Sequence, residues 1–320
     1  MRIRFWGTRG SIPVAADGRT IRQKIKRALR AADGRRFKNE TELDRFIEDS
    51  LDFPTRRGYG GDTACIQIEG GRDYMLCDMG SGLRRFGHQV MQAHRPESHR
   101  VYHFLMSHTH WDHIQGFPFF PPAYIPGNTI IIYSCMETEV LAGALEKQHS
   151  APCFPVEWSQ LGAKIVFEHL PADCWHTING FRVKGLRQPH QGGSFCYRFE
   201  KDGKSLVYAT DAEYKQAKEQ ETEAVIAFFK DADVVIFDAM YSLADMVTVK
   251  EDWGHSSNIV GVDLCLRANV GHYCMFHHEP AYDDELLYKV LLETRRYGEI
   301  ASESRPLKIS AAYDDMVIDI

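Results

Sequence analysis

The chain has 320 residues, of which 44% are hydrophobic and 26% are charged. This balance is typical of a globular protein, and a chain of this length buries enough surface to fold without disulfide bonds. The formal net charge of −6 argues against a dedicated DNA-binding protein.

The expected cellular location follows from the cysteines and from the apolar segments. None of the eight cysteines forms a C-x-x-C pair, and most lie in apolar runs, so we interpret them as reduced, buried thiols. The N-terminus has no apolar signal-peptide core, and no window of 18 apolar residues occurs. The sequence therefore predicts a cytoplasmic protein that does not span a membrane.

The N-terminal part combines a strand with a pair of helices. A first strand is expected at Ile3–Trp6, before the segment Gly7-Thr-Arg-Gly-Ser-Ile-Pro13. Amphipathic helices are expected at Thr20–Ala31 and Glu42–Leu51, where apolar residues recur at helical spacing. Because strand patterns resume on either side, we expect residues 17–57 to be a helical insertion.

The inserted segment is strongly basic. Between Arg19 and Lys38 there are nine Lys or Arg residues and one acidic residue, Asp33. This run is either a solvated helix face or a lid that attracts phosphate groups. The apolar stripe of the same helices could also serve a homodimer.

The rest of the chain alternates strands and helices. Strands are expected at Thr63–Glu69, Asp73–Cys77, Val101–Met106, Thr129–Tyr133, Ala163–His169, Gly180–Leu186, Ser194–Glu200, Ser205–Ala209, Val234–Asp238, His272–Phe276 and Met316–Ile320. Helices are expected at Glu137–Gln148, Glu213–Lys230, Ser257–Ala268 and Asp283–Tyr297. The strands come in two blocks, each followed by helices. This order predicts two sheets packed face to face with helices outside, a four-layer αββα fold in one domain, residues 1–320.

The strongest functional signal is the segment Ser107-His-Thr-His-Trp-Asp-His113, which directly follows an apolar strand. A strand places alternate side chains on one face, so His108 and His110 can point the same way. The chain must then turn, which lets Asp112 and His113 face a second point nearby. Imidazole and carboxylate groups are suitable ligands for zinc, manganese or iron.

The pattern His108-x-His110-x-Asp112-His113 resembles the metal motif of the metallo-β-lactamase superfamily. Gly7–Pro13 and Tyr59-Gly-Gly-Asp-Thr-Ala-Cys65 resemble segments of its branch that contains tRNase Z and cyclic-nucleotide phosphodiesterases, although Asp62 stands where such proteins often have Asn. The resemblance implies the αββα sandwich and two divalent metal ions, with zinc the first choice and manganese or iron as alternatives.

The resemblance also implies further ligands at the ends of later strands. His190 and Asp211 occupy such places, and for the last ligand the sequence offers both His277 and His278, of which we choose His277 by resemblance to related nucleases. One metal would then be held by His108, His110 and His190, and the other by Asp112, His113 and His277, with Asp211 between them. Asp78 would fix a ligand histidine through a hydrogen bond.

The segment Trp253-Gly-His-Ser-Ser257 resembles the C-terminal arrangement of tRNase Z and of small phosphodiesterases. This resemblance implies that His255 faces the scissile phosphate, where it could stabilise an oxygen or protonate the leaving group. Ser256 is a weaker candidate for a phosphate contact, because it or Ser257 could instead cap the following helix. Arg9 is another weak candidate.

These observations predict a phosphodiesterase in which Asp112 orients a metal-bound hydroxide that attacks phosphorus. The long glycine-rich arm with which tRNase Z grips transfer RNA is not apparent, and a short loop, Pro118–Pro126, stands instead. A small diester, such as a cyclic nucleotide, is therefore favoured over a long nucleic acid. Two alternatives remain. One is a hydrolase of carboxylic esters, thioesters or lactones on the same site, and the other is a non-catalytic metal-binding sensor.

Overall fold

The computed structural model describes residues 1–94, 98–214, 219–248, 253–302 and 305–320, and the strands among them form two seven-stranded sheets. The first has the order β14-β1-β2-β3-β4-β5-β6 and the second the order β13-β12-β11-β10-β9-β8-β7. The first comprises β1 (Arg2–Gly7), β2 (Cys65–Glu69), β3 (Tyr74–Cys77), β4 (Val101–Leu105), β5 (Thr129–Ser134), β6 (Lys164–His169) and β14 (Val317–Asp319). The second comprises β7 (Trp175–Ile178), β8 (Phe181–Gln188), β9 (Ser194–Lys201), β10 (Lys204–Ala209), β11 (Val234–Asp238), β12 (His272–Phe276) and β13 (Lys308–Ala311).

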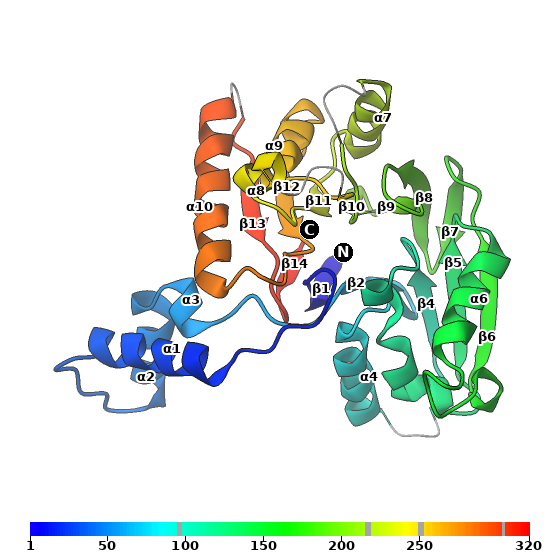
Figure 1. Cartoon of the computed structure of the whole chain (residues 1–320), viewed down its shortest axis with the longest axis horizontal. Helices are drawn as coiled ribbons and strands as arrows, with labels where there is room; N and C mark the ends of the chain where they lie inside the picture. The colour runs from blue at the N-terminus through cyan, green and yellow to red at the C-terminus, as the bar shows by residue number, and fades with distance from the viewer. Residues whose placement is uncertain (95–97, 215–218, 249–252, 303–304) are drawn as a thin grey trace.

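Helices cover the outer faces of both sheets (Figure 1). The first sheet is accompanied by α4 (Gly82–Ala93), α5 (Trp111–Ile114), α6 (Thr138–Gln148) and the short 3₁₀ turns η1 (Phe117–Phe119), η2 (Pro121–Tyr124) and η3 (Trp158–Gln160). The second is accompanied by α7 (Glu219–Phe229), α8 (Leu243–Thr248), α9 (Asn258–Arg267) and α10 (Asp284–Ala301). The predicted αββα sandwich is confirmed. None of the described helices is both long and apolar enough to cross a bilayer.

Alternation along the strands divides the apolar residues among three layers of core. In β11, Val234 and Ile236 pack between the sheets, whereas Val235 and Phe237 pack under the helices. In β4, Leu105 joins the core between the sheets and Phe104 faces the α4 side. Successive strand residues point to opposite faces, so a strand buried on both sides is apolar throughout. This explains why β11 and β12 are buried along their whole length.

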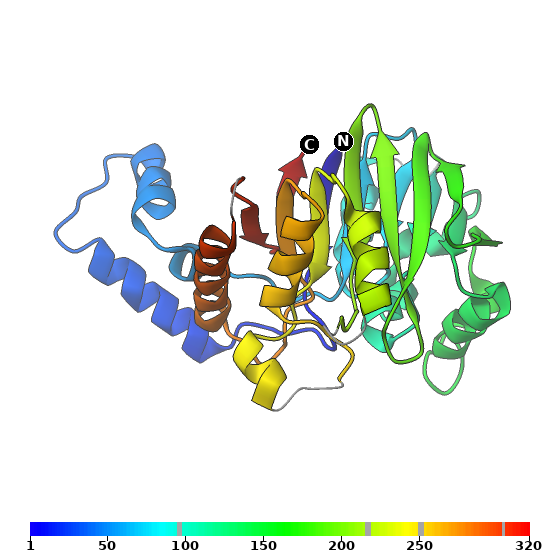
Figure 2. The ribbon, with the colours of Figure 1, turned by 90° about the horizontal axis from the view of Figure 1, so that it is seen from above.

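Between β1 and β2 lie α1 (Gly18–Ala31), α2 (Glu40–Ser50) and α3 (Phe53–Arg56), as predicted for the insertion. They project from the body of the protein beside α10 (Figures 1 and 2). Lys24 anchors α1, because its Nζ lies 2.6 Å from Asp284 Oδ2 and donates to the Arg57 carbonyl. Arg27 forms an ion pair with Glu285, also on α10. Every residue of α1, all of them described, remains at least partly exposed.

Several elements were not predicted from the sequence. Helix α4 buries Leu83, Phe86 and Val90 at helical spacing, although it contains two glycines. The strands β7 and β13 have four residues each, too few for a clear alternation. The predicted helix Glu213–Lys230 is observed as α7 from Glu219, and residues 215–218 of that prediction lie outside the described part of the chain.

Candidate metal centre

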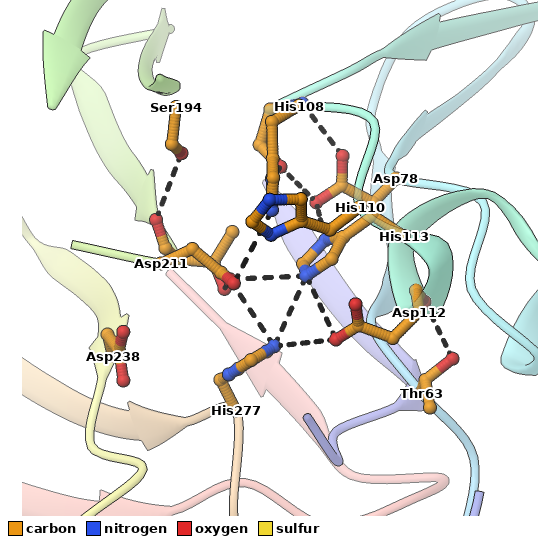
Figure 3. Close-up of polar contacts among 12 residues, drawn as sticks. Thr63, Asp78, His108, His110, Asp112, His113, Ser194, Asp211, Asp238 and His277 are labelled. Atoms are coloured by element: carbon orange, nitrogen blue, oxygen red, sulfur yellow. Dashed lines mark hydrogen bonds and ion pairs between the residues drawn. The ribbon is translucent and has the colours of Figure 1, made fainter. Parts of the chain in front are cut away.

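The candidate site lies where parallel strands of both sheets end. In the first sheet β3 and β4 run parallel, with Cys77 beside Leu105. In the second sheet β10, β11 and β12 run parallel, so that their carboxyl ends share an edge. Side chains that follow these strands therefore converge between the two sheets. Figure 3 shows Asp211 and His277 pointing toward His113 and Asp112 from the opposite sheet.

Three residues that follow these strands have left-handed backbone conformations. The φ angles are 59° at Asp78, 50° at Asp211 and 60° at His277. This region is uncommon for residues other than glycine, and such residues concentrate at functional sites. The conformation turns the chain sharply after β3, β10 and β12. It is a local constraint that motif spacing does not reveal.

One group of possible ligand atoms comes from His108, His110, His190 and Asp211, all within 4.8 Å of one another. His190 Nε2 lies 3.0 Å from His110 Nδ1 and 3.7 Å from Asp211 Oδ2. His108 Nε2 lies 3.5 Å from the same carboxylate oxygen. His190 is held from behind, because its Nδ1 lies 2.7 Å from the Gly254 carbonyl oxygen.

A second group of possible ligand atoms comes from Asp112, His113, Asp211 and His277, and these residues are buried. His277 Nε2 lies 3.0 Å from Asp112 Oδ2 and 3.4 Å from Asp211 Oδ1. His113 Nε2 lies 3.2 Å from Asp211 Oδ1. Asp211 thus presents one oxygen to each group, which is the arrangement expected of a bridging carboxylate.

Asp78 lies behind the second group and is fully buried. Its Oδ2 lies 2.8 Å from His113 Nδ1, which fixes the orientation of that ring and leaves Nε2 facing the cluster. The same carboxylate accepts hydrogen bonds from the Ser107 hydroxyl and the Tyr208 hydroxyl, each at 2.7 Å. Tyr208 was not singled out from the sequence, because a tyrosine inside an apolar strand has the pattern of a core residue.

The electrostatics of the cluster suit a bound cation. Burial raises the pKa of Asp211, but His113, His277 and His108 outweigh it and hold that pKa well below its ordinary value. Burial lowers the pKa of His108 well below its usual range, and the neighbouring His113 lowers it further. Ionised Asp211 and neutral His108 are the forms in which carboxylate and imidazole bind metals, whereas the carboxylates around His113 outweigh its burial and raise its pKa well above the usual value. The buried Nε2 of His108 also has no hydrogen-bond partner among the described residues. The residues present therefore fit a divalent cation.

His255 lies against the cluster and pairs with a carboxylate that the sequence analysis missed. Its Nδ1 lies 2.7 Å from Asp238 Oδ2, and its ring stacks on that of His277 at a centroid separation of 5.1 Å. Burial lowers the pKa of His255, but Asp238 outweighs it, and the pKa rises to about 9. Asp238 is the last residue of β11. An acidic residue at the end of an otherwise apolar strand is the sequence feature by which it could have been identified.

The two weaker phosphate candidates are engaged elsewhere. Arg9 is 3% exposed, and its guanidinium donates to the backbone carbonyls of Gly60, Glu279 and Tyr282. Ser256 is fully buried, donates to the Ala212 carbonyl and accepts from the Tyr214 amide. Both residues therefore join loops around the site, and we do not carry them into the proposed phosphate contacts. Ser257 caps α9.

Two glycines make room for ligand rings. A Cβ on Gly10 would lie 2.5 Å from His277 Cε1 and 2.6 Å from its Nδ1. A Cβ on Gly254 would lie 2.8 Å from His190 Nδ1. All three distances are shorter than van der Waals contact permits. The two glycines, in the N-terminal and Trp253–Ser257 motifs, therefore permit the backbone to approach the two rings.

The adjacent residues His277 and His278 point in different directions. His277 Nε2 faces Asp112 and Asp211, as described above. His278 is fully buried, and its Nε2 lies 2.8 Å from the Ala312 carbonyl oxygen. Of the two candidates, the structure brings His277 into the cluster.

Comparisons with known proteins agree with this architecture. The family described as "Beta-lactamase superfamily domain" matches residues 74–278. A Ribonuclease Z from Sulfurisphaera tokodaii is 33% identical over 87 residues, which are 27% of this chain and 27% of that protein. The metallo-β-lactamase fold protein YhfI from Bacillus subtilis has a TM-score of 0.64 at 15% identity, with 99% of this chain and 98% of that chain covered. A diphosphatase from the PhnP family has a TM-score of 0.59 at 15% identity, with 100% and 97% covered.

Proposed function

The chain belongs to the β-lactamase superfamily, and from this premise we propose that it is a metal-dependent phosphodiesterase of small substrates. The observation that carries the proposal is the His255–Asp238 pair beside a cluster of buried histidines and aspartates. The cluster supports metal-dependent hydrolysis, and the pair supports an anionic substrate such as a phosphodiester.

His108, His110 and His190 would hold one divalent cation, and Asp112, His113 and His277 the other, with Asp211 between them. Zinc is the first choice and manganese or iron are alternatives, since His/Asp sites accept several metals. Two such ions supply an activated water near neutral pH and charge stabilisation for phosphoryl oxygens. Asp78 keeps the His113 ring in place for this purpose.

His255 would act on the substrate itself. Asp238 accepts a hydrogen bond from its Nδ1, which raises the pKa of His255 and favours the imidazolium form. A cationic ring beside the cluster can donate a hydrogen bond from Nε2 to a phosphoryl oxygen or a proton to the leaving oxygen. Asp112, whose Oδ2 faces His277, would orient the attacking water.

The relatives support this class of substrate without establishing it. The matched Ribonuclease Z is named for the cleavage of RNA, and the PhnP-family protein is named a diphosphatase. The first match covers about a quarter of either chain, and the second is a likeness of fold. We further propose a cytoplasmic location, because all eight cysteines are free thiols.

The test replaces His255 with Ala and measures metal content together with hydrolysis of bis-p-nitrophenyl phosphate. We expect retained metal and a loss of kcat of about 10²–10³-fold, the usual effect of removing a hydrogen-bond donor to a transition-state oxygen, because the p-nitrophenolate leaving group needs little protonation. His88→Ala is the matched control, because His88 is exposed on α4. Unchanged turnover in His255→Ala would remove His255 from the mechanism. A larger rate enhancement over the uncatalysed reaction for p-nitrophenyl acetate than for the diester would favour a carboxylic ester hydrolase instead.

A further inference from the structure

A cavity of about 720 Å³ lies beside the candidate metal centre. Its lining comes from residues 11–15 after β1, from residues 240, 241, 253 and 255 on either side of α8, and from residues 279–281 after β12. His255 forms part of its wall. The backbone amide of Ser11, another wall residue, donates to Asp112 Oδ2 at 2.7 Å. The cavity therefore adjoins the site at which the proposed reaction would occur.

The character of the lining is apolar and aromatic. Ile12 and Trp253 line the cavity and are each 57% exposed, although large apolar side chains are ordinarily buried. Tyr241, with its ring 5.8 Å from that of His255, also lines it. Exposed apolar side chains that gather in a concave place beside polar groups are typical of ligand sites.

Apart from His255, which would face the reacting phosphate, the described lining offers no cationic side chain to a second anionic group. None of the described residues that line the cavity is a lysine or an arginine. Glu279 is the acidic residue among the described lining residues, and its Oε1 accepts a hydrogen bond from the Ala281 amide. A carboxylate repels a second phosphate and accepts hydrogen bonds from N–H donors. A polyanionic strand is therefore a poor occupant of this cavity.

We propose that this cavity binds a neutral aromatic ring of the substrate, of the nucleobase type, with Trp253 as the stacking surface and Glu279 as the acceptor for ring N–H groups. This inference rests on the proposed function, since the cavity would hold the organic part of the diester whose phosphate lies at the metals. A base stacked on one aromatic side chain contributes enough affinity to select a nucleoside ester over a simple alkyl ester.

Equilibrium binding tests the proposal without relying on turnover. Uridine 5′-monophosphate and inorganic phosphate are titrated calorimetrically into the full-length, metal-loaded protein. We expect the nucleotide to bind more tightly than phosphate, and Trp253→Ala to weaken nucleotide binding about 5- to 100-fold. Ile12→Ser should also weaken nucleotide binding, because Ile12 lines the same cavity although it lies far from Trp253 in the sequence. Trp175→Ala is the control, because Trp175 is an exposed tryptophan on the edge strand β7.

A second titration tests the role of Glu279. 3-Methyluridine 5′-monophosphate differs from the uridine nucleotide by a methyl group on N3, which removes the only N–H group of the ring. The wild type should bind it more weakly, and Glu279→Gln should narrow that difference. Equal binding of the two nucleotides by the wild type would refute the role of Glu279.

The outcomes separate this inference from the proposed function. Trp253-dependent nucleotide binding without hydrolysis of bis-p-nitrophenyl phosphate would support the cavity and refute the phosphodiesterase. Hydrolysis of the diester, combined with nucleotide affinity that neither Trp253→Ala nor Ile12→Ser changes, would refute the cavity and leave the phosphodiesterase standing.

Discussion

Replacing Gly10 with alanine should weaken one cation site without unfolding the protein. The new methyl group would lie 2.5 Å from His277 Cε1 and 3.0 Å from its Nε2. Carbon atoms in contact ordinarily lie about 3.5–4.0 Å apart, so the ring must move by about 1 Å. Metal–ligand distances tolerate about 0.2 Å, and changes that misplace a ligand cost about 10- to 100-fold in metal affinity.

A 10- to 100-fold loss of metal affinity corresponds to about 1.4–2.8 kcal/mol of binding free energy. The assay is a competitive zinc titration combined with metal analysis of the purified protein. We expect Gly10→Ala to lose affinity at the site of Asp112, His113 and His277, and to keep the other. Gly143→Ala is the matched control, because its methyl group would meet no atom within 4 Å in helix α6, and alanine there should stabilise the fold by up to about 1 kcal/mol. If Gly10→Ala bound zinc as tightly as the wild type at both sites, the steric argument would be refuted.

Three further predictions concern buried polar groups. Burial raises the pKa of Asp314 to about 7, so the stability that this carboxyl contributes is present below about pH 4 and is lost as the pH rises to about 7. Asp314→Asn should therefore stabilise the protein at pH 8, by an amount on the order of 4 kcal/mol at most, and have little such effect at pH 4; equal effects in urea melts at both pH values would contradict this. Tyr208→Phe removes a hydrogen bond to the buried Asp78 and should cost about 1.5–3 kcal/mol of unfolding free energy, and an unchanged urea midpoint would argue against that hydrogen bond. Removing the cations with a chelator should lower the Tm, because Asp112 and Asp211 would lose their counter-charges, and re-addition of zinc should restore it; a Tm insensitive to chelation would count against a structural contribution of the metals.

Much of the fold could be predicted because apolar periodicity is a local signal. The strands Val234–Asp238 and His272–Phe276 were predicted with the bounds that the structure shows. Pairing order is not local, however. The edge strand β13 has four residues, which are too few for a sequence pattern. It is recognised as a strand because it pairs with β12. Helix α4 carried a readable stripe of Leu83, Phe86 and Val90, but Gly82 and Gly87 obscured it.

The predicted ligands could be found because those of the first sheet lie in one short motif, His108–His113. The ligands of the second sheet each follow the end of a strand. The supporting groups could not be predicted in this way. Asp238 contacts His255, which is 17 positions away in the sequence, and Tyr208 contacts Asp78, which is 130 positions away. Arg9 shows the opposite case, since a motif arginine suggested a phosphate contact but its guanidinium holds three backbone carbonyls. Residue type alone does not distinguish these uses.

The most direct test of the central claim is anomalous diffraction from crystals of the zinc-loaded protein. The account predicts two peaks roughly 3.5–4 Å apart. His108, His110 and His190 should surround one peak, Asp112, His113 and His277 the other, and Asp211 should lie between them. Peaks located away from these residues would contradict the proposed two-cation site, and so would peaks from which the side chains of these residues point away.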